Sequence, residues 1–458
     1  MTTAVETFEA LRRRLTGALA VPGEPLYAAL TAGFNVAIAA TPAAVVEARD
    51  AQDVVEAVRF AATTGRAVAV QATGHGLAST LDGAILVHTG RLDECVVHPD
   101  GWARVGAGVR WQQVLDAAAP HGLAPLCGSA PAVGVVGYTT GGGLGPVART
   151  YGWASDRVRA IEIVTGDGVP RRVTATEEPD LFWGVRGGKG ALGIVTALEF
   201  DLVPLPEVYA GALYFAGADA HAVVHRWREW SSALPAEATT SLALLQLPPM
   251  PGVPEPLAGK FSVAVRFAWT GSQASGEAVL APMRAAAEPL IDAVQTIPYA
   301  GIGMVHADPV DPMPVVEDTD LLTALPAEAV DALLAVAGPD ARSPQVIVEL
   351  RQLGGALAAE PAQPSALCHR DAAFVLTIIG VPVPPIADAL VPHAAAVRAA
   401  LGPWATGGAL PNHGAAAGPE RIARSYDAET LTRLIELTER YDPAHVLRAG
   451  QVPVRPAA

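Results

Sequence analysis

The stretch Val68-Ala-Val-Gln-Ala-Thr-Gly-His-Gly76 predicts an apolar strand that ends in a histidine held between two glycines. Because glycine has no Cβ, Gly74 and Gly76 allow a tight turn and let the backbone approach a ligand closely. The segment before it, Asp50 to Gly65, predicts a helix with Asp50 as its cap and Gly65 at its end. His75 is therefore expected in a loop at the carboxyl end of a buried strand. Taken alone, a glycine-flanked histidine is also typical of an ordinary turn.

Two further glycine-rich stretches follow. They are Pro131-Ala-Val-Gly-Val-Val-Gly-Tyr-Thr-Thr-Gly-Gly-Gly-Leu-Gly145 and Phe182-Trp-Gly-Val-Arg-Gly-Gly-Lys-Gly-Ala-Leu-Gly-Ile-Val195. Part of the third stretch, from Gly188 to Gly193, matches the GxGxxG pattern of dinucleotide-binding Rossmann folds. That pattern requires a helix immediately after it. The residues that follow, Ile194 to Leu202, alternate like a strand, which argues against a Rossmann site.

Composition sets the broad class of the protein. The chain has 458 residues, of which 51% are hydrophobic and 17% charged, so a globular fold of more than one lobe is expected. The formal net charge of −15 argues against a nucleic-acid partner. The cysteines Cys95, Cys127 and Cys368 are odd in number and scattered, which predicts neither a disulfide framework nor a metal site. With no signal-peptide pattern and no apolar run of roughly 18–20 residues, we expect a cytoplasmic protein without a membrane segment.

The pattern of predicted strands and helices changes near Pro204. Before it, short strands alternate with helices, and Asp167-Gly168 predicts a hairpin between strands 158–165 and 171–174. After it, segments 242–247, 261–269 and 345–351 alternate like strands of an antiparallel sheet, separated by proline-rich connections and helices such as 218–230. This pattern predicts an α+β protein with two lobes.

The three glycine-rich stretches, in this order, resemble FAD-linked oxidoreductases of the berberine bridge enzyme and 6-hydroxynicotine oxidase type. The resemblance continues through the second lobe, in Glu349-Leu-Arg-Gln-Leu-Gly-Gly-Ala356 and His369-Arg-Asp371, and into the closing Tyr441-Asp-Pro-Ala-His-Val-Leu-Arg-Ala-Gly-Gln451. It implies the two-lobed, PCMH-type FAD-binding fold shared with vanillyl-alcohol oxidase and p-cresol methylhydroxylase. The expected divisions are a helical segment 1–36, an FAD-binding domain 37–205, an antiparallel-sheet substrate domain 206–405 covered by helices, and a segment 406–458 that returns to the FAD lobe.

The resemblance also implies which residues hold the cofactor. His75 would carry FAD through the flavin 8α-methyl group, and the amides of Thr73, Gly74 and Gly76 would cradle the pyrophosphate, since successive backbone N–H groups favour anions. The segment 134–145 would wrap the isoalloxazine. The remaining cofactor contacts expected from the resemblance are Val133, Gly134, Gly137, Thr139, Gly142, Gly143, Gly145, Tyr151, Asp156, Ile194 and Val195.

Two positions depart from the family pattern. Some members hold the flavin by a second bond from a cysteine just before Pro-x-Val-Gly, where this chain has Ala130, so only the histidyl bond is expected. Cys127 lies three residues earlier and is interpreted as a buried thiol. The family tyrosine of a Tyr-x-Asn motif is replaced by Leu410, which leaves Asn412 and His413 in that segment.

Four residues are candidates for the chemistry. His413 is the leading candidate for a base, because an imidazole titrates near neutral pH and Asn412 lies beside it; a supporting or surface histidine is the alternative. Glu349 shares a strand face with Arg351 and is expected either to face the flavin or to form an ion pair. Tyr138 replaces a common family histidine and is expected to contact the cofactor.

The predicted function is that of an FAD-dependent oxidase. It would oxidise a C–OH, C–N or activated C–H group of a small, natural-product or alkaloid-like substrate, with O₂ as acceptor because the resemblance associates Val133 with oxidases. The alternatives are an FAD-dependent dehydrogenase that uses another acceptor and a non-redox scaffold that retains flavin. The expected partners are the substrate and O₂, and the chain is expected as a monomer or a homodimer.

Overall fold

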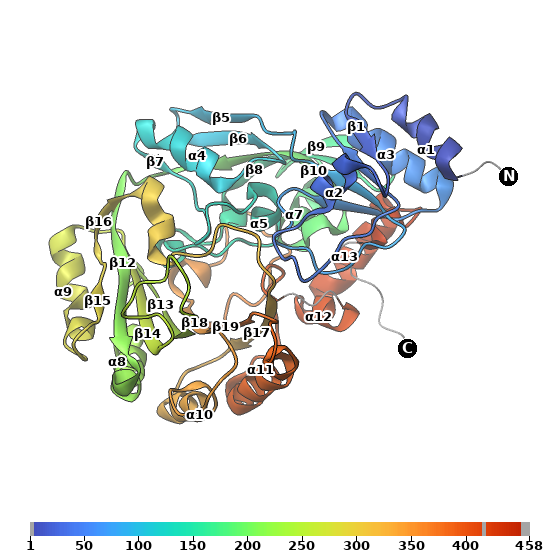
Figure 1. The fold of residues 1–458 in the computed structure, drawn as a ribbon. Coiled ribbons are helices and arrows are strands. Elements are labelled where there is room, and N and C mark those ends of the chain that lie inside the picture. The colour runs from blue at the N-terminus through green and yellow to red at the C-terminus, as the bar shows by residue number, and fades with distance from the viewer. Residues whose placement is uncertain (1–3, 415–417, 450–458) are drawn as a thin grey trace.

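The computed structural model describes residues 4–414 and 418–449, which form two lobes joined along one side (Figure 1). The first lobe contains two sheets, and the second contains one large sheet. The last helices of the chain, drawn in red, return to the first lobe (Figure 1). The α+β, two-lobed architecture is therefore as the sequence predicts. The end of the closing motif, Gly450 and Gln451, lies outside the described residues.

The first sheet carries the histidine loop. Its strands run in the order β1-β2-β4-β3, and β2, β4 and β3 are mutually parallel. Their bounds are β1 (Ala18–Ala20), β2 (Ala44–Glu47), β4 (Ile85–His88) and β3 (Val68–Gln71). Strand β1 lies within the predicted helical segment 1–36 and extends this sheet.

Helix α3 (Ala51–Thr64) connects β2 to β3 and confirms the predicted helix. The Asp50 side chain accepts a hydrogen bond from the backbone N–H of Asp53, which satisfies a free amide of the first turn. Gly65 ends the helix in the left-handed conformation, with φ 67°. The strand that leads to His75 therefore begins at a position fixed by local sequence.

The second sheet is antiparallel and has the order β5-β6-β10-β8-β9. Its strands are β5 (Cys95–His98), β6 (Trp102–Gly106), β10 (Gly193–Asp201), β8 (Val158–Thr165) and β9 (Pro170–Thr174), and a short pair β7 (Leu123–Ala124) and β11 (Val203–Pro204) lies beside it. Strands β8 and β9 form the predicted hairpin. The strand β10 directly follows the GxGxxG-like sequence, so the rejection of a Rossmann site is confirmed.

The third sheet makes up most of the second lobe and is antiparallel throughout. Its main path is β15-β12-β14-β13-β18-β19-β17, and β16 pairs with β12. The strands are β12 (Glu207–Ala216), β13 (Ala238–Gln246), β14 (Phe261–Trp269), β15 (Ile291–Asp292), β16 (Gln295–Pro298), β17 (Val316–Leu322), β18 (Ile347–Gln352) and β19 (Phe374–Gly380).

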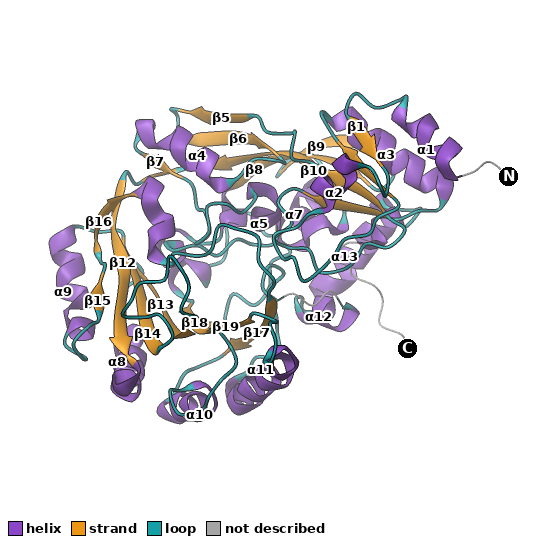
Figure 2. Ribbon diagram, viewed as in Figure 1, coloured by secondary structure: helices purple, strands orange, loops and turns teal. Residues whose placement is uncertain are grey.

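Helices cover the outer face of this third sheet, away from the first lobe (Figure 2). Trp227, Val330 and Val397 come from three of these helices and pack into one core with sheet residues such as Leu350. Because successive strand residues point to opposite faces, the neighbours of Leu350, Glu349 and Arg351, point toward the first lobe. The covering helices are α8 (Ala220–Ser232), α9 (Gln273–Arg284), α10 (Ala327–Ala337) and α11 (Ala387–Leu401).

The remaining helices belong to the first lobe or join it to the second. They are α1 (Ala4–Arg12), α2 (Pro25–Thr31), α4 (Trp111–Ala118), α5 (Val135–Thr140), α6 (Ala148–Tyr151), α7 (Pro179–Gly188), α12 (Pro419–Arg424) and α13 (Ala428–Tyr441). Helices α5 and α7 occupy parts of the second and third glycine-rich stretches, so these stretches are short helices flanked by turns rather than continuous loops. Within the described residues, no helix is both long and apolar enough to cross a bilayer.

Candidate cofactor and substrate site

The His75 loop directly follows strand β3, the last strand in the order of its sheet. Gly74 has φ 72°, and a Cβ at this position would lie 2.5 Å from the Cα of Gly33, so only glycine fits the turn. The His75 ring stacks on Phe34 with 4.1 Å between ring centroids, and its Nδ1 lies 2.9 Å from Thr73 Oγ1. The imidazole is thus held on two sides by its own loop and the preceding segment.

The His75 imidazole is neutral near pH 7. Burial, together with the charge of Arg110, lowers its pKa to about 4. A neutral imidazole retains a lone pair on one ring nitrogen, which both coordination and bond formation to carbon require. Gly76, the next residue, is exposed and leaves the backbone open beside the ring.

The second glycine-rich stretch wraps around the tyrosine that the sequence singled out. Gly142 and Gly143 have φ values of 106° and 81°, and a Cβ at Gly143 would lie 2.6 Å from the Tyr138 ring. The Tyr138 ring packs edge-on against Trp111, with 5.4 Å between centroids. Its hydroxyl is buried with no hydrogen-bond partner among the described residues, and burial raises its pKa well above the usual range.

One side of α5 is left open. A Cβ added at Gly137 would meet no atom within 4 Å, whereas Gly134 lies against Thr73. The Thr139 hydroxyl is buried and has no hydrogen-bond partner in the described part of the chain. Since buried polar groups are normally satisfied, this hydroxyl indicates a missing polar partner. Val133 lies just before the helix, half-buried, and its carbonyl accepts a hydrogen bond from Trp111.

The third stretch brings a cation to the same place. Lys189 has φ 53° and ψ −134°, a combination that glycine adopts far more readily than a residue with a side chain. Its Nζ lies 3.8 Å from the position that a Gly76 Cβ would take. Burial, and after it the charge of Arg421, lowers the pKa of Lys189 to about 8, while Glu317 acts in the opposite direction.

The facing side of the third sheet carries a charged cluster set by strand register. Ser241 of β13 pairs with Arg266 of β14 on one side and with Arg351 of β18 on the other. Glu349 lies two residues from Arg351 on the same face. Its carboxylate accepts hydrogen bonds from Ser241 Oγ at 2.8 Å, Arg266 Nη1 at 2.5 Å and Arg351 Nε at 2.7 Å.

The cluster fixes the charge of Glu349. Burial alone would raise its pKa, but Arg351, Arg266 and His306 together hold it well below its usual range. His306 Nε2 lies 3.5 Å from the Glu349 carboxylate. An ionised, fully hydrogen-bonded carboxylate is a weak proton acceptor, so the geometry favours the ion-pair alternative for Glu349.

The C-terminal segment lies between the second glycine-rich stretch and the charged cluster of the third sheet. Asn412 Nδ2 donates a hydrogen bond to the Tyr138 carbonyl at 2.6 Å, and a Cβ at Gly141 would lie 2.1 Å from Asn412 Oδ1. Burial, followed by the charges of Arg351 and Arg421, lowers the pKa of His413 to about 3. Asn412 therefore holds the second glycine-rich stretch, and His413 lies close to the charged cluster.

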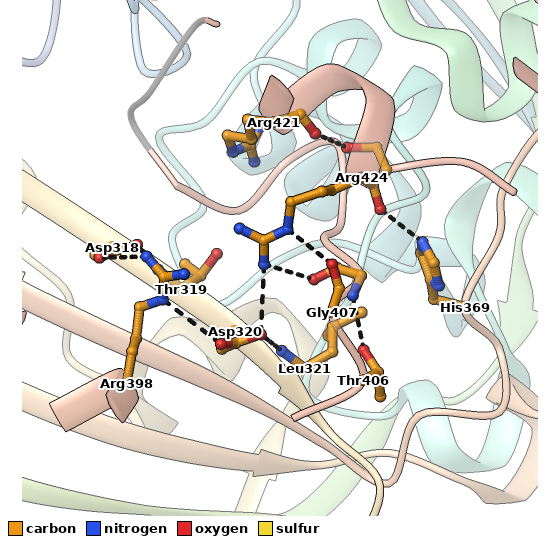
Figure 3. A network of polar contacts seen from close by, with 12 residues as sticks. Asp318, Thr319, Asp320, Leu321, His369, Arg398, Thr406, Gly407, Arg421 and Arg424 are labelled. Atoms are coloured by element: carbon orange, nitrogen blue, oxygen red, sulfur yellow. Dashed lines mark hydrogen bonds and ion pairs between the residues drawn. The ribbon is translucent and has the colours of Figure 1, made fainter. Parts of the chain in front are cut away.

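Figure 3 shows how this segment is fastened to the edge strand β17. Arg424 donates hydrogen bonds to the carbonyls of Gly407, at 2.7 Å, and Gly408, at 3.2 Å, and lies 3.5 Å from Asp320. His369 Nε2 contacts the Arg424 carbonyl at 2.8 Å. The network fixes the ends of the turn that carries Asn412 and His413.

Four of the predicted cofactor contacts have side chains that are paired with, or packed against, other parts of the protein. Asp156 forms a two-bond ion pair with Arg370, at 2.9 and 2.6 Å, which ties the first lobe to the segment after β18. Tyr151 ends the short helix α6 and is half-buried. The side chains of Ile194 and Val195 are 1% and 6% exposed and pack in hydrophobic cores, so only their backbone is available to a ligand.

Sequence reasoning missed five charged or titratable residues of this junction. They are Lys189, Arg266, His306, Glu317 and Arg421. Only Lys189 had a local signal, because it lies between two glycines of a stretch that was expected near the cofactor. The buried Cys127, whose pKa burial raises to about 12, agrees with the interpretation as an inert thiol.

Comparison with known proteins identifies the cofactor domain. Residues 42–174 match the family described as "FAD binding domain". The chain contains an FAD binding domain. The matched region includes both the His75 loop and the second glycine-rich stretch, which confirms the family resemblance seen in the sequence.

One curated relative and two solved structures illustrate the likeness. "(R)-6-hydroxynicotine oxidase" from Paenarthrobacter nicotinovorans is 34% identical over 180 residues, which is 38% of this chain and 39% of that protein. "Physcomitrella patens BBE-like 1 wild-type" has a TM-score of 0.86 at 18% identity and covers 100% of both chains. "Functional roles of the 6-s-cysteinyl, 8 alpha-N1-histidyl FAD in Glucooligosaccharide Oxidase from Acremonium strictum" has a TM-score of 0.84 at 18% identity, covering 98% of this chain and 99% of that chain.

The two kinds of similarity differ in extent. By sequence, the chain spans about a third to just over half of the length of the curated relatives it matches. By structure, the likeness covers both lobes and confirms the predicted PCMH-type fold. The family match, over residues 42–174, lies in the first lobe, and the likeness in structure extends over both lobes.

Proposed function

We propose that this protein is an FAD-dependent oxidase of small molecules in which His75 carries the flavin. The single observation that carries the proposal is the convergence of three elements on one junction. His75 and the open face of α5 come from the FAD binding domain, and the charged cluster around Glu349 faces them from the third sheet. A pocket between a cofactor domain and a separate sheet is a common position for a redox active site.

The residues at the junction suit FAD. Gly76 is exposed and the space beside Gly137 is empty, so neither residue has a side chain that would obstruct a planar ring there. The Thr139 hydroxyl lacks a partner among the described residues, and the ring carbonyls and nitrogens of a flavin are hydrogen-bonding groups. Successive backbone amides in the turn 73–76 favour a pyrophosphate.

A single histidyl link is proposed for the flavin. The neutral imidazole of His75 has the lone pair that a bond to carbon requires. Ala130 occupies the position of the second, cysteinyl attachment, and Cys127 is buried with a pKa of about 12. The relative whose name includes both a cysteinyl and a histidyl FAD has two links, so this chain is proposed to keep only the second of these.

Bound FAD supplies two-electron oxidation of a C–OH, C–N or activated C–H group. The chain's own residues position the substrate and favour the removal of its proton. Lys189, Arg351 and Arg421 stabilise negative charge and so favour loss of a proton from a bound hydroxyl or amine. His413, kept neutral by the same surroundings, is proposed to accept a hydrogen bond from the substrate.

Glu349 is proposed as a positioning residue rather than a base. It holds Arg266 and Arg351 in fixed orientations, and its three hydrogen bonds leave it little capacity to take a proton. The proposed acceptor of electrons is O₂, on the basis of Val133 and the oxidase relatives. The substrate is proposed to be a small molecule that fits between α5 and the third sheet.

The first experiment is a visible spectrum before and after acid precipitation of the purified protein. Yellow colour that stays with the pellet in wild type, and is lost to the supernatant in His75→Ala, is the expected result. His121→Ala, which removes an exposed histidine of the same lobe, is the matched control and should keep the colour in the pellet. Colour in the supernatant for wild type would overturn the covalent link and keep the cofactor, whereas a colourless protein that takes up no added FAD would overturn the function.

A second experiment separates an oxidase from the other functions. Reduced protein is mixed with air-saturated buffer in a stopped-flow instrument, and reoxidation within seconds is expected. Very slow reoxidation with fast reaction toward a quinone or dye would indicate a dehydrogenase. Absence of flavin bleaching by any candidate substrate would favour a scaffold that retains flavin.

A further inference from the structure

Two histidines and an aspartate meet on the outer surface of the second lobe, on the side of the third sheet away from the proposed redox site. His221 and His225 are one turn apart on α8, so both side chains lie on the same side of that helix. Asp331 comes from α10, which runs beside α8 (Figure 1). Within the described residues, this is the one group of three histidine, cysteine or acidic side chains close enough to share a metal ion.

The three ligand atoms have the spacing of a metal site. Asp331 Oδ1 lies 2.9 Å from His225 Nε2 and 3.7 Å from His221 Nε2, and all three atoms are within 4.8 Å of one another. Tetrahedral Zn²⁺ with bonds of about 2.0–2.1 Å places its ligand atoms about 3.3 Å apart. The two measured distances lie on either side of this value, so small side-chain rotations bring the atoms into place.

We propose that His221, His225 and Asp331 bind a divalent transition metal ion of the Zn²⁺ class, which links α8 to α10. Two imidazoles and one carboxylate form a donor set that suits Zn²⁺, whereas Mg²⁺ and Ca²⁺ prefer oxygen ligands throughout. The two imidazole nitrogens approach the same carboxylate oxygen, and their rings are 4.4 Å apart. A shared cation at this point satisfies both nitrogens at once.

Exposure of the group agrees with a site that water and metal reach easily. The side chains of His221, Asp331 and His225 are 77%, 59% and 21% exposed. Three protein ligands on a surface leave the fourth position of the ion to water. Because the third ligand comes from another helix, the pattern could not be predicted from the spacing along the chain.

The expected consequence is stabilisation of the second lobe. The three ligands are assembled only in the folded protein, so a metal that binds them raises the free energy of unfolding. The junction between the lobes lies on the opposite face of the sheet, so flavin content and substrate oxidation should not depend on the metal. The inference is therefore independent of the proposed function.

The test uses untagged, chelator-treated protein titrated with Zn²⁺ in a calorimeter, with the thermal midpoint measured in parallel. One equivalent bound with a micromolar dissociation constant, and a rise of several degrees in the midpoint, is the expected result. Mg²⁺ should produce neither effect. His225→Ala and Asp331→Asn should abolish both, whereas His121→Ala, which removes an exposed histidine elsewhere, should leave both unchanged.

His221→Ala keeps the test valid if one of the other two variants fails to fold. Its side chain is the most exposed of the three, so its removal should leave the metal-free thermal midpoint near that of wild type and still weaken Zn²⁺ binding. The proposal is overturned if wild type shows no saturable Zn²⁺ binding. It is equally overturned if binding persists unchanged in His221→Ala and Asp331→Asn.

Discussion

The two walls of the junction are built in different ways. The wall from the FAD binding domain consists of glycine-rich turns, and its shape depends on backbone conformations such as φ 72° at Gly74 and φ 81° at Gly143. The opposite wall, on the third sheet, is a cluster of charges around Glu349. The first is fixed by residues close in sequence, and the second by the register of β14, β13 and β18. The glycine-rich wall could therefore be predicted from the sequence, whereas the charged wall is recognised only in the folded structure.

The largest effect is expected on the charged wall. Glu349→Gln removes the negative charge that Arg266 and Arg351 share, and leaves two cations close together in a buried position. Breaking a buried ion pair in this way should lower the free energy of unfolding by about 3–5 kcal/mol. Urea unfolding followed by circular dichroism measures the loss.

Glu317→Gln is the matched control for this prediction. Glu317 accepts one backbone hydrogen bond, from Gly414, and burial raises the pKa of its carboxyl group, so its ionised form is less strongly favoured. Its replacement should cost clearly less than that of Glu349. Equal losses for the two variants would show that the register-based cluster is not the strongest charge interaction of the junction.

The second effect tests the glycine-rich wall. Gly143→Ala forces a side chain into a left-handed conformation and against the Tyr138 ring, 2.6 Å from the new Cβ. The expected loss is about 2–4 kcal/mol in the free energy of unfolding. Gly190→Ala is the control, because a Cβ there meets no atom within 4 Å and should cost less than about 1 kcal/mol. Similar losses for Gly143→Ala and Gly190→Ala would mean that the turn at Gly143 can accommodate a side chain, and that its backbone conformation does not require glycine.

The contrast between the walls also explains what the sequence could predict. Helix α3, the strand before His75, the hairpin of β8 and β9 and the strand after the third glycine-rich stretch all depend on local signals, and each is found. Glycine-rich turns carry their own conformational requirement, so their positions were predictable. Helices α5 and α7 were not predicted within those stretches, because glycine has a low helix propensity.

Long-range contacts limit the rest of the prediction. Glu349 meets Arg266 only because β13 lies between β14 and β18, and no spacing along the chain reveals that order. Asn412 was expected near the flavin as a candidate for the chemistry, and its contact with the Tyr138 carbonyl depends on the path of the chain after α11. Lys189 is evident in the sequence, but its position beside Gly76 depends on the contact between two segments that are far apart along the chain.

The third effect tests the link between the walls. Asn412→Ala removes the hydrogen bond to the Tyr138 carbonyl and the contact with Gly141, and should cost about 1–2 kcal/mol in the free energy of unfolding. Asn412→Asp keeps the size of the side chain but loses the amide donor, so it should cost at least as much. If Asn412→Asp is as stable as wild type, shape rather than hydrogen bonding fixes the second glycine-rich stretch.

The effect that is smallest at neutral pH, where it vanishes, is a pH dependence that reports on His413. Burial and the neighbouring Arg351 and Arg421 lower its pKa to about 3, whereas an imidazole in the unfolded chain titrates near 6.5. Above that pH both states are neutral and His413 contributes nothing to the dependence. As the pH falls from about 6.5 toward 3, the unfolded state binds a proton that the folded state excludes, so stability is lost with falling pH.

His413→Gln should therefore flatten the decline of the thermal midpoint over this range, by a few degrees at pH 4.5. His121→Ala, an exposed histidine, should leave the decline as in wild type. A decline that is equally steep in His413→Gln would mean that the imidazole is solvated rather than held against the cations, and the substrate contact proposed for it would lose its support.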